Sequence, residues 1–139
     1  MQVSSLSFFW ETDTLSIYLV NATEGLIYSS DEVTAGLLVD YSSNDEIVAL
    51  DVALASKRIA AEFWDAGGTH DGKPSLQLHT SFDPVQARFT ISFGASRPGV
   101  KSKTTDDERI TVSEDEDGRW TGIVILIRGQ TNTELTASR

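Results

Sequence analysis

Hydrophobic and polar residues alternate along most of this chain, and a period of two is typical of β-strands with one buried face. The alternation begins in residues 6–10 and returns in 15–19, on the far side of a polar turn at 11–14. Three later stretches repeat it, at 37–54, 76–93 and 109–128. The sequence therefore predicts a chain built mainly from β-hairpins.

One segment changes to the period of an amphipathic helix. Ala55, Ile59 and Phe63 stand four positions apart, which places them on one helical face. We expect a helix over about residues 55–65, with Ser56 as its N-cap. Elsewhere, residues 26–28 are predicted to form a short strand. Residues 94–108 are polar and are predicted to be a loop.

The last strand constrains how the hairpins pack. Residues 123–127 are apolar on both faces, so other elements must cover both. A length of 139 residues suits one domain with one core. We predict a single mainly β domain over residues 1–139, an antiparallel sandwich or barrel, with a frayed tail at 129–139. The competing class is α+β, with the helix on one open sheet.

The chain also resembles itself. The turn that follows Phe8 aligns with the turn that follows Phe82, an offset of 74. The hairpin that contains Val39 aligns with the one that contains Val112, an offset of 73. Two matches in the same order at nearly the same offset indicate an internal duplication. We expect hairpin-rich repeats at about 3–54 and 76–128, with the helix between them.

The residues of both repeats carry a family resemblance. The first repeat reads Asp13-x-Leu15-x-Ile17, then Gly36-Leu37-Leu38-Val39-Asp40-Tyr41, and the second reads Asp115-Glu116-Asp117-Gly118-Arg119-Trp120 before its last strand. This pattern resembles the family called domain of unknown function 2283, present here as two tandem copies. The resemblance implies a fold of turns and strands and is silent about activity.

The acidic positions of this pattern differ between the two copies. The first copy keeps Asp13, Asp40 and Asp51. The second copy has Ala87, Ser113 and Val124 at these places. If the acids have a chemical role, the first copy alone can supply them.

Charge is distributed unevenly. Residues 1–56 contain nine acidic residues and no Lys or Arg, and the net charge of the whole chain is −10. Such a surface repels phosphate backbones, so we expect no nucleic-acid binding. The chain lacks a basic amphipathic helix, so we expect no membrane binding either. The acidic half favours solubility or a face for a cationic partner.

Motifs for catalysis or metal binding are weak. The chain has no cysteine, which excludes disulfides, thiolate ligands and cysteine nucleophiles and is compatible with the cytoplasm. The segment Gly67–Lys73 resembles a phosphate-binding loop, but Pro74 stands where Ser or Thr must bind magnesium. The histidines His70 and His79 cannot by themselves provide three nitrogen ligands for zinc. The sequence therefore predicts no metal and no cofactor.

Two functions remain open. The first, which we favour, is a non-catalytic binding or interaction module with a cationic protein partner. The second is a small β-barrel enzyme or carrier for an apolar small molecule, which needs no recognisable motif. A homodimer is compatible with either.

The candidate ligand-binding residues are Asp40, Tyr41, Asp51, Trp64 and His79. Asp40 and Asp51 have apolar neighbours on the two strands of one hairpin, and residues 1–56 provide no base to pair with them. We expect them either to hold the two copies together, paired with Lys57, Arg58, Arg88 or Arg119, or to lie at a pocket wall.

Overall fold

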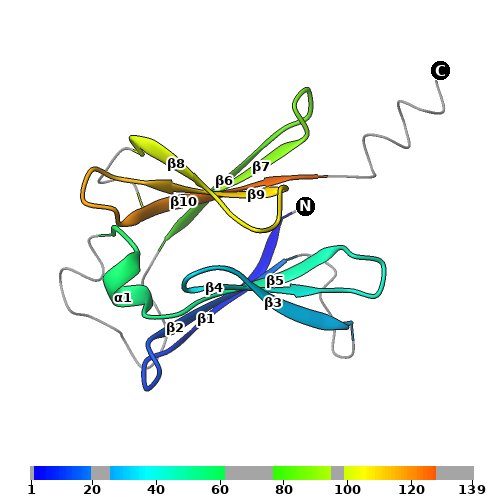
Figure 1. The fold of residues 1–139 in the computed structure, drawn as a ribbon, viewed down its shortest axis with the longest axis horizontal. Coiled ribbons are helices and arrows are strands. Elements are labelled where there is room, and N and C mark those ends of the chain that lie inside the picture. Colours follow the sequence, from blue (N-terminus) through cyan, green and yellow to red (C-terminus); the bar gives the residue numbers. More distant parts are fainter. Residues whose placement is uncertain (1, 20–25, 62–76, 95–98, 128–139) are drawn as a thin grey trace.

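The computed structural model describes residues 2–19, 26–61, 77–94 and 99–127, which form two five-stranded antiparallel sheets and one short helix (Figure 1). The first sheet has the order β1-β2-β5-β4-β3, and the second has the order β6-β7-β10-β9-β8. The strands of the first sheet are β1 (Val3–Phe9), β2 (Thr14–Leu19), β3 (Ser29–Thr34), β4 (Leu37–Tyr41) and β5 (Ile47–Val52). Those of the second are β6 (Leu78–Asp83), β7 (Arg88–Phe93), β8 (Lys101–Thr104), β9 (Ile110–Glu114) and β10 (Trp120–Leu126). The predicted mainly β class is confirmed.

The two sheets share their register as well as their strand order. The equivalent pairs are Phe8–Leu15 and Phe82–Phe89, Val39–Leu50 and Val112–Ile123, and, next to a bulge in each sheet, Tyr41–Ile47 and Glu114–Trp120. These pairs follow the offsets of 74 and 73 that the sequence predicts. The two sheets therefore have the same strand order and equivalent registers.

The core lies between the two sheets, which lie one above the other in Figure 1. Alternate residues of the central strands are fully buried there, among them Leu15, Leu50, Ile91 and Ile123. Residues of both sheets belong to one hydrophobic cluster. The sheets do not close into a barrel, so the arrangement is sandwich-like, and the α+β alternative with one open sheet is wrong.

The helix is shorter than predicted. α1 spans Ala55–Arg58, and the backbone becomes extended at Ile59, with φ −91° and ψ 128°. Ile59 forms a parallel bridge with Trp120, and the N–H of Ala60 donates to the Trp120 carbonyl at 2.8 Å. This pairing with the second sheet replaces the next helical turn, so the predicted helix over 55–65 is wrong at residues 59–61, and residues 62–65 lie outside the described residues. Phe63 lies outside the described residues.

The start of the helix also differs from the prediction. Leu54 occupies the N-cap position with a left-handed backbone, and it makes no side-chain cap. Ser56, the predicted cap, instead donates its N–H and its hydroxyl to the carboxylate of Asp13, at 3.0 and 2.7 Å. Asp13 therefore fixes the first turn of α1 to the β1–β2 hairpin.

Two strands lie where the sequence predicts none. β3 begins just after the predicted strand at 26–28, and β8 lies within the predicted loop at 94–108. Each is the outermost strand of its sheet, so its backbone pairs with one neighbour. Polar side chains predominate on both, and the period of two is therefore missing.

The tail at 129–139 lies outside the described residues. Among the residues that the structure describes, no helix is long and apolar enough to cross a membrane.

Candidate functional site

A cleft of about 540 Å³ opens between β3 and the segment that joins β8 to β9. The first sheet contributes β3, Tyr41 and Asp45, and the second contributes residues 106–109. The acidic residues that line it are Asp31, Glu32, Asp45, Asp106, Asp107 and Glu108. Arg109 is the one basic residue among the described residues of the lining.

Local hydrogen bonds set the shape of the acidic segment. The Thr105 hydroxyl lies 2.8 Å from the Asp107 carbonyl and 2.9 Å from the Ile110 carbonyl, and it accepts the Asp107 N–H at 3.1 Å. The N–H of Asp106 donates to the Val33 carbonyl of β3 at 2.7 Å. The segment is therefore fixed both to its own turn and to the facing sheet.

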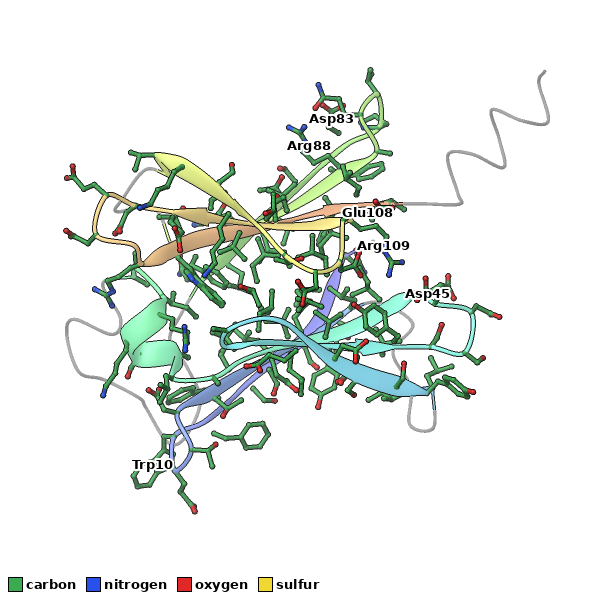
Figure 2. The ribbon with its side chains drawn as sticks, viewed as in Figure 1. Trp10, Asp45, Asp83, Arg88, Glu108 and Arg109 are labelled. Atoms are coloured by element: carbon green, nitrogen blue, oxygen red, sulfur yellow. The ribbon has the colours of Figure 1, made fainter. Side chains whose placement is uncertain are left out.

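Asp107 is the centre of a network that joins the sheets. Its carboxylate accepts the Tyr41 hydroxyl at 2.8 Å and the Arg109 Nε and Nη2 at 3.0 and 2.8 Å. Arg109 also donates Nη1 to the Asp45 carbonyl at 2.7 Å, across to the first sheet. Figure 2 shows Arg109 and Asp45 facing each other from the two sheets. The guanidinium carbon lies 5.6 Å from the centre of the Tyr41 ring, within range of a cation–π contact.

This network shifts the pKa values of its members. Burial by itself would raise the pKa of Asp107, but the hydrogen bonds from Arg109 and Tyr41 outweigh it, and the pKa lies below its ordinary value. The hydrogen bond with Asp107 raises the pKa of Arg109. Burial, followed by the bond to Asp107, raises the pKa of Tyr41 well above its usual range. At neutral pH the three groups are a carboxylate, a guanidinium and a neutral phenol.

The remaining charge of the cleft is negative. Arg109 is already bound to Asp107 and lies 3.7 Å from a carboxylate oxygen of Asp45. Asp31, Glu32 and Asp106 are exposed. Among the described residues, no group of three or more acidic or histidine side chains has a geometry that could hold a metal ion. The arrangement is suited to binding a positively charged group.

Of the predicted site residues, Tyr41 lines this cleft and the two aspartates do not. Asp40 alternates with Val39, and Asp51 with Leu50, and both apolar residues are in the core. The two carboxylates therefore lie on the outer face of the first sheet. Asp40 is buried and accepts a hydrogen bond from the Ser30 hydroxyl.

Asp51 is half-buried on this outer face. Burial raises its pKa, a hydrogen bond with Ser16 lowers it, and the nearby charge of Asp40 raises it again, so that the net shift is upward. Two of the bases named as partners bond to other groups. Arg58 donates to the Ala53 carbonyl at 2.9 Å, and Arg119 donates to the carbonyls of Ser56 and Ile59, at 3.2 and 2.7 Å.

His79 is not among the described residues that line the cleft. His79 is exposed on β6, at the edge of the second sheet. Trp64 lies outside the described residues. Asp107 and Arg109 were missed because they are 66 and 64 positions from the residues that they bind in the first sheet. The available signal was a run of three acids at 106–108, immediately before Arg109 at the start of a predicted strand.

Comparison with known proteins gives one match. Residues 6–56 match a family described as "Protein of unknown function (DUF2283)". This stretch runs from within β1 into α1, so it covers most of the first sheet. No curated protein and no solved structure matches the chain.

Proposed function

We propose that this protein is a non-catalytic binding module whose acidic cleft receives a positively charged segment of a partner protein. The observation that carries the proposal is the composition of the cleft, where six acidic residues surround one arginine that is already paired. A cationic side chain entering the cleft meets exposed carboxylates on two sides, from β3 and from the 106–109 segment. Opposite charges at the protein surface attract by up to about 1 kcal/mol per pair.

The rigid base of the cleft supports this proposal. Tyr41, Asp107 and Arg109 are held in place by four short contacts within the network. A partner therefore does not need to order these side chains, which lowers the entropic cost of binding. The same negative field opposes nucleic acid, and we propose a protein partner in the cytoplasm.

We also propose that residues 76–128 are a second copy of the domain matched at residues 6–56. The shared strand order and equivalent registers of the two sheets support this relation. The cleft then lies between two copies, so a single copy would lack half of it.

The test is the binding of a lysine-rich peptide, measured by fluorescence anisotropy at low and physiological ionic strength. The cleft variant Asp31→Asn, Glu32→Gln, Asp106→Asn removes three exposed charges. The control variant Glu11→Gln, Glu116→Gln, Asp117→Asn removes three exposed charges outside the cleft.

We expect the cleft variant to bind about tenfold more weakly, since three surface pairs together contribute about 1.4 kcal/mol. The control should bind within about twofold of the original protein, and added salt should weaken binding. Equal losses in both variants would show attraction by net charge alone and would refute a specific cleft.

A further inference from the structure

The outermost strands β3 and β8 occupy equivalent places in the two sheets. Their backbones pair with β4 and β9 on one side, and their other sides form the edges of the sheets. Residues 29–32 of β3 are exposed, as are Lys101, Ser102 and Thr104 of β8. Such an edge can accept a further strand.

The two edges carry opposite charges. β3 has Asp31 and Glu32, whereas β8 has Lys101 and Lys103. Asp31 pairs with Val39 and Lys103 pairs with Val112, so the acid and the base stand at equivalent positions. Among the described residues, neither lysine forms an ion pair. The charge of one edge is therefore available to complement the other.

We propose that β3 of one molecule pairs in an antiparallel manner with β8 of a second copy of this chain. The inference rests on the proposed function, because β3 forms one wall of the acidic cleft. Lys101 and Lys103 are two positions apart and lie on one side of β8. The second copy thus supplies the cationic segment, in extended form.

The similarity of the two sheets determines on which face of the combined sheet the lysines lie. β3 and β8 are equivalent edge strands of similar sheets. If they pair in an antiparallel manner, the two sheets join with their core-facing sides on the same face of the combined sheet. Lys101 and Lys103 of the second copy then lie beside Asp31, at the mouth of the cleft. A parallel pair would turn the lysines to the opposite side of the sheet.

Pairing of like edges is disfavoured. Two β3 strands would bring Asp31 and Glu32 against the same acids, and two β8 strands would bring lysine against lysine. The favoured contact therefore joins β3 of one copy to β8 of the other. Each copy has both edges, so this contact can form twice in a closed twofold dimer, or once at each interface of a ring or fibre. β8 has four residues, which keeps each contact weak.

The test uses sedimentation velocity of the full chain at protein concentrations up to about 1 mM. One variant carries Asp31→Lys with Glu32→Lys, and the other carries Lys101→Glu with Lys103→Glu. Each variant has like-charged edges, so neither should associate alone. An equimolar mixture restores opposite charges at every contact and should sediment as larger species, like the original protein.

A monomeric original protein, or a mixture that remains monomeric, would overturn the inference. Circular dichroism of each variant confirms folding, and if the β3 variant does not fold, Lys101→Gln with Lys103→Gln tests β8 by itself. This last variant leaves the cleft intact. It should lose self-association yet bind the lysine-rich peptide within about twofold of the original protein. Loss of peptide binding in the cleft variant is a separate result, so the two proposals can fail independently.

Discussion

Replacing Asp107 by Asn tests whether the network at the base of the cleft holds the two sheets together. The Asp107 and Arg109 side chains are only 10% and 11% exposed, so their pairing is largely shielded from water. Asp107 accepts bonds from Tyr41 and from two nitrogens of the Arg109 side chain. Hydrogen bonds to charged groups contribute about 1.5–3 kcal/mol, and removing one partner of a buried pair costs about 3–5 kcal/mol.

Asn retains one acceptor oxygen, so we expect Asp107→Asn to lower the free energy of unfolding by about 2–4 kcal/mol at pH 7. With a urea dependence of about 1.5–2 kcal/mol per molar, the midpoint should fall by roughly 1–2.7 M. The assay is urea unfolding followed by circular dichroism. The control is Asp106→Asn, an exposed neighbour, which should change the free energy by about 0.5 kcal/mol or less.

The pH dependence provides the decisive comparison. Because folding lowers the pKa of Asp107, its ionised form stabilises the protein above the unfolded pKa of about 3.9. That stabilisation is lost as the pH falls through the lower, folded value. The difference between the original protein and Asp107→Asn should therefore shrink in acid. A difference that is constant with pH, or equal losses in the Asp106 control, would refute this account.

Three further changes have defined outcomes. Asp51→Asn should raise the melting temperature at pH 7, because the raised pKa makes ionisation costly, and this gain should disappear in acid, where Asp51 is protonated. Gly122→Ala should cost about 2–4 kcal/mol in chemical unfolding, since its Cβ would lie 2.6 Å from the Ile91 carbonyl oxygen; a smaller loss would mean that the sheet yields there. Ala87→Asn should stabilise by about 0.5–1 kcal/mol in the same assay, because Ala87 has φ 53° and Asn tolerates that backbone; a loss would contradict this.

The central strands could be predicted from the sequence because their pattern is local. Leu15, Ile17 and Leu50 alternate with smaller or polar residues and are fully buried. The edge strands β3 and β8 could not be predicted in this way. Pairing with β4 and β9 fixes their extended backbone, and their own side chains contribute little to the core. Strand pairing depends on neighbours that a local period does not reveal.

The predictions of the helix and of the site were incomplete for a related reason. Ile59 continues the helical period of α1, but its bridge to Trp120 of β10 makes the chain extended there. Tyr41 was identified as a candidate, whereas its actual partner Asp107 is 66 positions away. In both cases a contact between the two halves decides the outcome, and no spacing within either half indicates it.

The two halves use different side chains to accept the backbone N–H groups at equivalent hairpin tips. At the tip of the β4–β5 hairpin, the Ser42 hydroxyl accepts the N–H groups of Asn44 and Glu46, each at 3.2 Å. At the equivalent tip, an Asp115 carboxylate oxygen accepts two N–H groups, from residues 117 and 119, each at 2.9 Å. The hydrogen-bond pattern is kept, while the side chain that provides it differs. Shared framework geometry therefore leaves side-chain charge free to differ between the halves.

This freedom makes the proposed binding surface asymmetric. The register places Glu114 where the first sheet has Tyr41, and Lys103 where it has Asp31. The second sheet thus lacks both the phenol that binds Asp107 and the acidic edge. Among the described residues, the second sheet therefore does not repeat the acidic cleft, and we expect a basic peptide to bind with a stoichiometry of one per chain. Titration calorimetry that gave two equivalent sites would mean that the shared framework, rather than the differing charges, determines binding.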